Sequence, residues 1–262
     1  MRLDIFLTER GFAESRSRAK RLIESGAVLL NGATVTKPGL EVLPEEAKVT
    51  VREERFVGRG GEKLLGALKC FDIDPRGLTA LDIGASTGGF TDCLLQNGAA
   101  HVTALDAGCG QLHPKLLADA RVTNMEKYNA RELSPLDVGQ VSLVVMDVSF
   151  ISQTYILPRI PDVLLPGGQV LTLIKPQFEA GREALNKKGI VKNAKDRIRA
   201  IRRVLQCGAE SGLSCCGLAQ SPILGGDGNE EYLAYWRRGE GKEADLAAIP
   251  VERIVLEGVI YR

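Results

Sequence analysis

The stretch from Leu78 to Gly110, LTALDIGASTGGFTDCLLQNGAAHVTALDAGCG, decides the fold of this chain. An apolar run ending at Ile83 leads into the glycine-rich turn GASTGG (84–89), and a second apolar run ends in an acid, Asp106. Strand, tight turn, helix, strand and carboxylate in this order are typical of nucleotide-cofactor sites in doubly wound α/β sheets. A βαβ unit without a ligand is the simpler interpretation, but the glycines and the terminal acid both favour a ligand.

The turn also indicates the kind of cofactor. Its spacing is not the G-x-G-x-x-G of dinucleotide sites, in which a pyrophosphate packs on a helix N-terminus. It is typical of sites for S-adenosylmethionine (SAM), where a sulfonium amino acid takes the place of the phosphates. We therefore predict a SAM site whose residues are Asp82, Gly84, Ala85, Ser86, Thr87, Gly88, Gly89 and Asp106.

The composition of the chain limits the kinds of domain, metal site and membrane segment that it can contain. With 262 residues, 44% of them hydrophobic, the chain can form one large domain and a small module. Six cysteines without a CxxC pair and only two histidines argue against a zinc site, so we expect no metal. Charged residues interrupt the start of the chain, and no apolar run approaches the ~18 residues of a membrane span. We therefore expect a cytoplasmic protein without a membrane partner.

The order of elements predicts an α/β fold, with a doubly wound seven-stranded sheet of the kind found in SAM-dependent methyltransferases. The strand candidates are Thr79–Ile83, His101–Leu105, Val122–Met125, Val141–Met146, Gln169–Ile174, Leu213–Gln220 and Tyr232–Arg237. We divide the chain into a small α+β module (1–55), a linker (56–61), the α/β domain (62–238) and a C-terminal extension (239–262). The last part of the extension, from residue 251, is predicted to be a short strand or a helix.

The N-terminal module has too little core to be an enzyme. Ser15 can cap a helix from about Arg16 to Ser25, and Asn31-Gly32 between two β-prone runs predicts a hairpin. The basic residues of the helix are Arg16, Arg18, Lys20 and Arg21. A basic helix beside a hairpin suits a phosphate backbone. An ordinary solvated helix face explains these charges about equally well.

Four ionisable residues stand at informative points of the α/β domain. Lys63 lies in GGEKL, Asp147 ends the run VSLVVMD, Lys175 ends VLTLIK, and Glu231 opens EYLAYW. If the last of these strands is antiparallel, its start reaches the edge at which the parallel strands end, where such sheets place their sites. We therefore expect the four side chains to converge beside the SAM pocket. Surface ion pairs are the competing interpretation for any one of them, but a weak one for all four.

Such a cluster suits the methylation of a ribose 2′-hydroxyl. The hydroxyl must lose its proton as the methyl group arrives, and a lysine with the ordinary pKa of about 10.4 is protonated and cannot accept it. Burial and a second lysine lower such a pKa, while carboxylates orient the ammonium and oppose that shift. A nitrogen-methylating enzyme would be expected to carry an NPPY- or DPPY-like strand end, where this chain reads DVSF (147–150).

The N-terminal module resembles the RNA-binding domain first seen in small-subunit ribosomal protein S-four. The shared features are Arg2-Leu3-Asp4, Ser15-Arg16, Ala19, Leu22-Ile23, Gly26, Val28, Asn31-Gly32 and Lys37-Pro38. The resemblance implies RNA binding, and the predicted RNA-binding residues of the module are Arg2, Arg16, Arg18, Lys20 and Arg21.

The rest of the chain resembles the FtsJ-like ribose methyltransferases, and the whole chain to about Arg238 resembles the TlyA family of hemolysin A-like ribosomal RNA 2′-O-methyltransferases. The shared blocks are GGEKL (60–64), DIGASTGGFTD (82–92), GxGQL (108–112), MDVSFIS (146–152), LIKPQFEAGR (173–182) and GNxEY (228–232). The resemblance implies that the catalytic tetrad is Lys63, Asp147, Lys175 and Glu231. It also implies that Asn129 meets the adenine of SAM and that Phe150 stacks on a flipped RNA base. A phenylalanine of the core is the competing interpretation for Phe150.

The chain departs from the family pattern at Cys109, where tyrosine is frequent, at Gly58, where serine is usual, and in the loop 223–227 before Glu231. A second basic stretch, 182–203, carries nine lysines and arginines. It fits a solvated outer face as well as an RNA track.

The leading hypothesis is SAM-dependent methyl transfer to a cytidine 2′-hydroxyl of ribosomal RNA, with ribosomal RNA or ribosomal subunits as the partner. A non-catalytic RNA-binding assembly factor that retains the fold is the alternative, and the intact tetrad argues against it. A membrane-lytic protein, as the hemolysin name implies, would be expected to show a span, a secretion signal or a long amphipathic basic helix, and none is apparent in the sequence.

Overall fold

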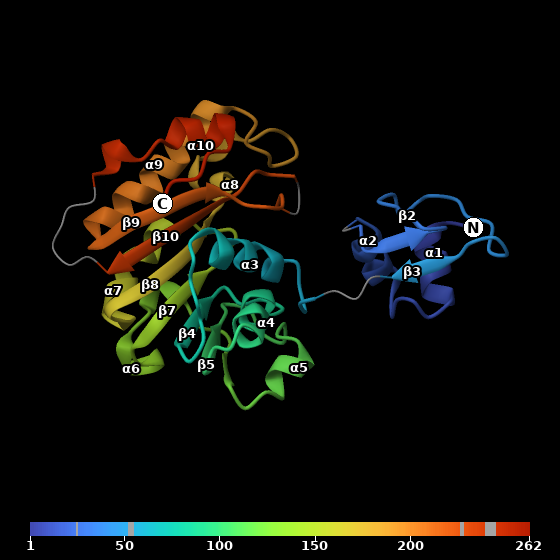
Figure 1. Ribbon diagram of the computed structural model, residues 1–262, viewed down its shortest axis with the longest axis horizontal. Helices are drawn as coiled ribbons and strands as arrows, with labels where there is room; N and C mark the ends of the chain where they lie inside the picture. The colour runs from blue at the N-terminus through green and yellow to red at the C-terminus, as the bar shows by residue number, and fades with distance from the viewer. Residues whose placement is uncertain (25, 52–54, 226–227, 239–244) are drawn as a thin grey trace. The chain divides into compact units, whose positions relative to one another are not determined.

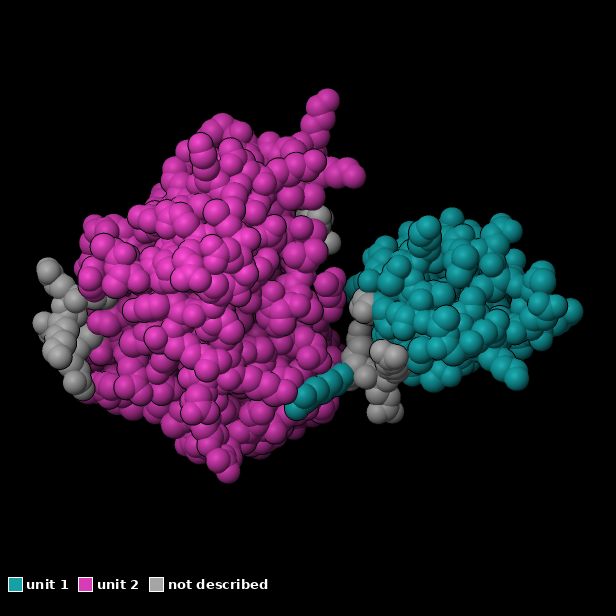
Figure 2. Space-filling model, turned by 45° about the horizontal axis from the view of Figure 1, so that its top comes forward, with its two compact units in different colours: residues 1–55 teal, residues 56–262 magenta. Residues whose placement is uncertain are grey.

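The chain forms two compact units, Met1–Arg55 and Phe56–Arg262, which Figure 2 colours separately. The computed structural model describes residues 1–262 apart from 25, 52–54, 226–227 and 239–244. Each unit has a hydrophobic core of its own.

The first unit joins two helices to a three-stranded sheet of order β2-β1-β3. Its elements are α1 (Leu3–Glu9), α2 (Arg16–Glu24), β1 (Val28–Leu30), β2 (Ala33–Thr34) and β3 (Val49–Val51). Ser15 Oγ accepts the N–H of Arg18, so the predicted cap of α2 is confirmed. Asn31 and Gly32 have φ of 52° and 83°, the left-handed values that a two-residue hairpin turn requires. The hairpin between β1 and β2 is therefore confirmed as well.

The second unit is built on a seven-stranded sheet of order β6-β5-β4-β7-β8-β10-β9, and the predicted α/β fold is confirmed (Figure 1). The strands are β4 (Thr79–Ile83), β5 (His101–Leu105), β6 (Val122–Met125), β7 (Val141–Met146), β8 (Leu164–Ile174), β9 (Leu213–Gln220) and β10 (Tyr232–Arg238). The strands from β6 to β8 are parallel, and β10 runs antiparallel to both β8 and β9. The start of β10 therefore lies at the edge where β7 and β8 end.

Helices and short 3-10 turns cover the sheet. They are α3 (Gly60–Cys70), α4 (Gly89–Gln96), α5 (Pro114–Leu117), η1 (Ala130–Glu132), α6 (Pro135–Val138), η2 (Gln153–Tyr155), η3 (Leu157–Arg159), α7 (Ile160–Val163), α8 (Pro176–Glu179), η4 (Arg182–Ala184), α9 (Ala194–Glu210), η5 (Leu246–Ala248) and α10 (Val251–Glu257). No helix among the described residues combines the length and the apolar character needed to cross a bilayer.

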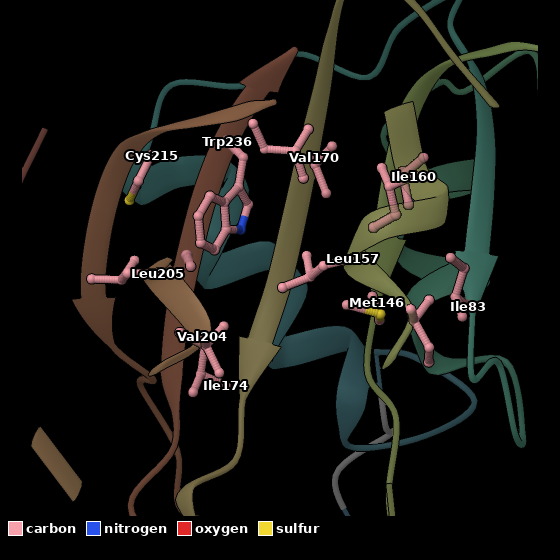
Figure 3. Close-up of a cluster of buried hydrophobic side chains, with 14 of the residues drawn as sticks. Ile83, Met146, Leu157, Ile160, Val170, Ile174, Val204, Leu205, Cys215 and Trp236 are labelled. Carbon is pink, nitrogen blue, oxygen red and sulfur yellow. The ribbon is translucent and has the colours of Figure 1, made fainter. Parts of the chain in front are cut away.

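Two hydrophobic clusters divide the side chains of the sheet, because alternate residues of a strand face opposite sides. Leu81 and Ile83 of β4 join the larger cluster with α7, α9 and α10, part of which appears in Figure 3. Ala80 of the same strand joins the other cluster with α3 and α4. In the larger cluster the fully buried Trp236 donates its indole N–H to Thr172 Oγ1 at 3.1 Å.

The unit boundary differs from the expected division at both ends of the α/β domain. The expected linker 56–61 belongs to the second unit, since Phe56 is only 4% exposed and α3 already begins at Gly60. The expected C-terminal extension also belongs to it, because α10 buries Val251, Ile254 and Val255 in the larger cluster. Part of the extension, 239–244, lies outside the described residues.

Candidate active site

A pocket of about 190 Å³ opens where the glycine turn meets the ends of β7 and β8. Its lining consists of Gly60, Gly84, Ala85, Ser86, Thr87, Gly89, Phe90, Asp147, Ser149 and Lys175. Five of the predicted cofactor residues and two of the predicted catalytic ones therefore share one cavity. Most of the lining is backbone and small side chains, which leaves room for a ligand to approach the main chain.

Gly84 shows why the turn needs glycine. Its φ is +84°, and a Cβ there would lie 2.9 Å from the carbonyl oxygen of Asp147. Asp147 in turn donates its N–H to the carbonyl of Ile83 at 3.0 Å. The ends of β4 and β7 therefore approach closely, and this approach sets the carboxylate of Asp147 beside the turn.

Gly88 was predicted to contact SAM, but the structure gives it a different role. Its φ is +92°, and a Cβ would run into the side chains of Leu112 and Leu116 rather than into the pocket. Gly88 also lies outside the lining. The structure therefore gives this glycine a packing role at the start of α4, which the spacing of glycines alone does not reveal.

Lys175 and Asp147 form the first of two ion pairs at this edge. Lys175 Nζ lies 2.7 Å from Asp147 Oδ1 and donates to Ser149 Oγ at 2.8 Å. The two side chains come from the ends of adjacent parallel strands, β8 and β7. Both face the pocket, so the charged pair and the glycine turn meet in one space.

Lys63 and Glu231 form the second ion pair. Lys63 Nζ, from the first turns of α3, donates to Glu231 Oε2 at 2.5 Å. The antiparallel register pairs Tyr232 with Ile174, so Glu231 and Lys175 lie at the same edge, as expected from the sequence. Lys63 is 8% exposed and Glu231 3%. A buried ion pair is costly to desolvate and is weak evidence for stability. Neither residue is part of the pocket lining, but Glu231 lies at the strand edge that carries Lys175, and Lys63 is bonded to it.

Two residues that the sequence did not single out lie near the ion pairs, Gln177 beside Glu231 and Gly60 beside Asp147. Gln177 Nε2 lies 3.5 Å from Glu231 Oε1, only two positions after Lys175. Gly60, one turn before Lys63, lines the pocket, and a Cβ on it would lie 3.7 Å from Asp147 Oδ2. Gln177 and Gly60 both fall inside the shared blocks LIKPQFEAGR and GGEKL.

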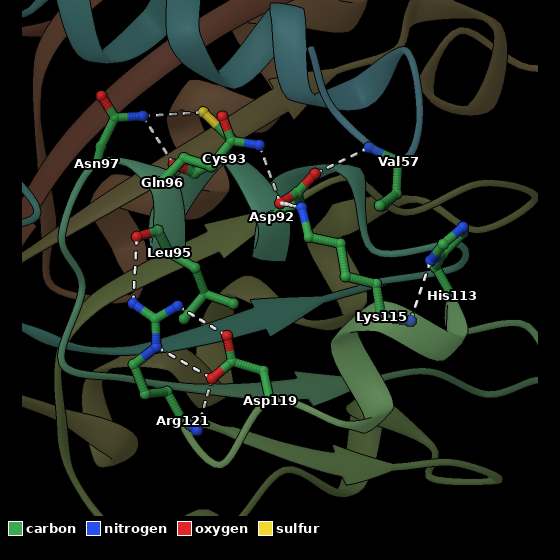
Figure 4. Close-up of polar contacts among 10 residues, drawn as sticks. All are labelled: Val57, Asp92, Cys93, Leu95, Gln96, Asn97, His113, Lys115, Asp119 and Arg121. Carbon is green, nitrogen blue, oxygen red and sulfur yellow. Dashed lines mark hydrogen bonds and ion pairs between the residues drawn. The ribbon is translucent and has the colours of Figure 1, made fainter. Parts of the chain in front are cut away.

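The segment before α3 is anchored by Asp92 of α4 (Figure 4). Asp92 Oδ2 accepts the N–H of Val57 at 2.9 Å, while Oδ1 accepts from Gln96 Nε2 at 3.0 Å and lies 3.5 Å from Lys115 Nζ. Asp92 is 2% exposed. These contacts fix the start of α3 and hence the helix that carries Lys63.

Asp82 lies under the turn rather than in the pocket. Its side chain is fully buried, and Oδ2 accepts from Thr91 Oγ1 at 2.6 Å, while Oδ1 has no hydrogen-bond partner among the described residues. Burial raises the pKa of Asp82 to about 7, opposed by the Thr91 hydroxyl and reinforced by the charges of Asp147 and Asp106. Its carboxyl is bonded to α4 and is not part of the lining.

Asp106 and Asn129 differ in what they contribute. Asp106 follows β5, and its carboxylate accepts the N–H groups of Ser86 at 2.8 Å and Gly108 at 2.7 Å. It therefore braces the turn while keeping lone pairs for a hydroxyl donor. Asn129 instead caps η1 and donates to Glu132 Oε1 at 2.9 Å, outside the lining.

Phe150 is exposed, not part of the core. Its side chain is 93% exposed, and its φ of +65° is rare for a non-glycine residue. Its ring lies beside that of Phe178, with 5.3 Å between the ring centroids and a tilt of 50°. Glu179 holds the loop that carries Phe150, since it accepts from Ser152 Oγ at 2.5 Å and from the N–H of Gln153 at 2.9 Å. The loop therefore presents an aromatic ring to solvent three residues after Asp147.

The basic residues of the first unit fall into two groups. Arg2 and Arg16 both bond the fully buried carboxylate of Asp4, with each Nε at 3.0 Å, and hold its pKa well below the usual range. These two arginines thus have a structural task that the sequence did not predict. Lys20 and Arg21 are exposed on α2, and Arg18 is half-buried.

Comparison with known proteins agrees with this geometry. Residues 56–238 match the FtsJ-like methyltransferase model, and residues 1–47 match the S4 domain. The chain is 40% identical over 262 residues to "16S/23S rRNA (cytidine-2'-O)-methyltransferase TlyA" of Mycobacterium tuberculosis, covering 98% of each sequence. The chain belongs to the TlyA family of FtsJ-like methyltransferases.

Solved structures place this TlyA-family chain in the same fold. A "Putative hemolysin from Streptococcus thermophilus" has a TM-score of 0.78 and 40% identity, covering 98% of this chain and 94% of that one. A SAM-dependent methyltransferase from Mesorhizobium loti has a TM-score of 0.52 at 15% identity, covering 69% of this chain and 100% of that one, which is a likeness of fold alone. The described residues of this family member contain no group of three or more metal-ligating side chains.

Proposed function

We propose that the protein transfers a methyl group from SAM to the ribose 2′-hydroxyl of cytidine in ribosomal RNA. The observation that carries the proposal is the Lys175–Asp147 contact in the lining of the glycine-turn pocket, with the Lys63–Glu231 contact at the same edge of the sheet. The relative in Mycobacterium tuberculosis is named for this reaction, and the chain has the domain of that class.

The pocket suits SAM by its shape and its chemistry. Gly84, Ala85 and Gly89 leave the main chain of the turn open. Asp106 is outside the lining but is bonded to Ser86, which is part of it, and it would accept hydrogen bonds from ribose hydroxyls there. SAM supplies a methyl group on a sulfonium, which an oxygen nucleophile can take up. The carboxylates at the edge of the pocket, Asp147 above all, suit a cationic ligand better than a phosphate-bearing one.

The ion pairs would manage the proton of the attacking hydroxyl. Asp147 and Ser149 fix the direction of Lys175 Nζ, so that this atom can hold the 2′-oxygen in place. Lys175 can first pass one of its ammonium protons to Asp147 Oδ1, 2.7 Å away, and the neutral amine then takes up the proton that leaves the hydroxyl, while the sulfonium that gives up its methyl group leaves as the neutral thioether. Glu231 and Lys63 would keep the second side of the site charged and rigid, because both are buried. Phe150 would stack on the flipped base.

Methyl-transfer assays on ribosomal RNA with the full chain and with Lys175→Met test the proposal. Loss of a positioned proton acceptor costs about 10²–10⁴-fold in rate. We expect a fall in that range with SAM affinity unchanged, because the turn that holds SAM is intact. A wild-type chain that binds RNA and SAM without transferring methyl would favour a non-catalytic assembly factor.

A further inference from the structure

Four lysines lie in the segment that joins η4 to the first residues of α9; residues 185–195 are here called the lysine loop. Figure 1 shows this segment between α8 and α9. An antiparallel bridge joins Leu185 to Val191, and Asn186 Oδ1 accepts the N–H groups of Lys188 at 2.8 Å and Ile190 at 3.0 Å. The turn is thus closed by its own hydrogen bonds. Its exposed cations are Lys187, Lys188, Lys192 and Lys195.

These four lysines differ from the arginines of α9 in their charge balance. Arg199 pairs with Asp196 at 3.0 Å, and Arg202 pairs with Glu252 at 2.7 Å. Arg197 pairs with Glu230 at 3.3 Å. Within the described part of the chain, none of the ion pairs involves a lysine of the loop. Three of the four arginines of α9 are therefore paired with carboxylates, and the fourth, Arg203, donates to the carbonyl of Glu179 at 3.3 Å. The four lysines, in contrast, are available to a negatively charged partner.

The lysine loop is bonded to the segment that carries Glu231. Asn229, 2% exposed, accepts the N–H of Val191 at 3.1 Å and donates to the carbonyl of Gly189 at 3.0 Å. Arg197 donates to the carbonyls of Val191 at 3.1 Å and Lys192 at 2.8 Å and also pairs with Glu230. The uncompensated charges are thus rigidly connected to residues one and two positions before Glu231.

We propose that the lysine loop is a second RNA-contact surface, in which Lys187, Lys188, Lys192 and Lys195 bind backbone phosphates of RNA close to the target ribose. The inference rests on the proposed function for its choice of RNA. Lysine is a flexible point charge that suits phosphates without reading sequence. A lipid surface is the less suitable partner, since no exposed large hydrophobic side chain of the described chain lies in 185–195 to enter a bilayer.

The test compares two full-length variants with the same loss of charge. One changes Lys187, Lys188, Lys192 and Lys195 to Gln. The control changes Arg76, Arg121, Arg202 and Arg253 to Gln, whose partners are Asp74, Asp119, Glu252 and Glu257. Affinity for a ribosomal RNA fragment is measured without SAM over a range of KCl concentrations. Thermal unfolding and SAM affinity are measured beside it, and so is pelleting with phosphatidylglycerol vesicles.

We expect the lysine variant to weaken RNA binding about tenfold or more near physiological salt, because several phosphate contacts are lost. We also expect the slope of log affinity against log salt to fall by about 2–3, because each phosphate contact contributes about 0.7–0.9. The control should change little. The proposal would be overturned if both variants had equal effects or if the slope of the lysine variant were unchanged. It would also be overturned if pelleting with vesicles depended on the lysines while RNA binding stayed normal. Because binding is read without methyl transfer, an inactive chain with a lysine-dependent slope would refute the proposed reaction alone.

Discussion

Glu231 accepts a hydrogen bond from Lys63 at 2.5 Å, although 168 positions separate them in the sequence. The contact joins the first turns of α3 to the start of the antiparallel strand β10, and both partners are buried. Two segments from opposite ends of the second unit therefore meet at the edge where β7 and β8 deliver Asp147 and Lys175.

The Lys63–Glu231 pair should behave as one functional element. We expect Lys63→Met and Glu231→Gln each to lower kcat/KM for RNA methylation by about 10²–10⁴-fold. The double variant should lose little more than either single one, because groups that act as a unit are not additive. Arg76→Met and Asp74→Asn, which break an exposed pair, are the matched control. If the losses of kcat/KM in the two single variants instead multiplied in the double variant, Lys63 and Glu231 would have independent roles.

Two glycines should give opposite results when a methyl group is added. Gly60→Ala places its Cβ 3.3 Å from the Phe90 ring and 3.7 Å from Asp147 Oδ2, so methylation and SAM affinity should fall more than stability. Gly88→Ala meets Leu112 and Leu116 at a φ of +92°, so the free energy of unfolding should fall by more than about 1 kcal/mol. Calorimetry and urea unfolding on both variants check this. If Gly88→Ala is as stable as wild type but cannot bind SAM, Gly88 belongs to the cofactor site after all.

Phe150→Ala should reduce activity without reducing stability. The ring is 93% exposed, so its removal opens no cavity. Base–aromatic stacking is worth about 1–3 kcal/mol, which corresponds to about 5–150-fold in methylation efficiency. Leu136→Ala, whose side chain is 95% exposed, is the control for loss of exposed apolar surface. Unchanged methylation by Phe150→Ala would remove the ring from RNA recognition.

Asp82 should make the stability of the second unit fall as pH rises towards neutrality. Burial raises its pKa to about 7, whereas an aspartate in an unfolded chain has a pKa of about 3.9. Between these values the folded state keeps a proton that the unfolded state has lost, so unfolding releases a proton and the free energy of unfolding decreases with pH.

Urea unfolding of wild type and Asp82→Asn at pH 5, 6 and 7 measures this contribution. Relative to the variant, which does not titrate, wild type should lose up to about 1.4 kcal/mol per pH unit, and the difference should level off above about pH 7. Parallel pH profiles would mean that Asp82 is already ionised in the folded protein.

Local patterns predicted much of this structure. The apolar runs predicted all seven strands of the large sheet, and Asn31-Gly32 predicted the hairpin. Charged residues at strand ends predicted that Asp147, Lys175 and Glu231 would share one edge, because the sheet topology determines where strands end. These features depend on neighbours in sequence or on the regular geometry of a sheet.

Features that depend on side-chain packing were not predictable. The glycine pattern indicated a close approach at Gly88, but only the structure shows Leu112 and Leu116 as its cause. From their charge, Arg2 and Arg16 were predicted to bind RNA together with the basic residues of α2. In the structure both bind the buried Asp4, which gives them a structural role. Likewise, α10 belongs to the large core because it packs against α9 and β9, which no local pattern reports.

The proposed reaction is tested most directly by mass-spectrometric analysis of nucleosides from ribosomal RNA incubated with SAM and the full chain. We expect 2′-O-methylcytidine with wild-type protein and its loss, by about 10²–10⁴-fold, with Lys175→Met. A methyl group found on a base nitrogen or carbon, or 2′-O-methylcytidine formed equally well by Lys175→Met, would contradict it.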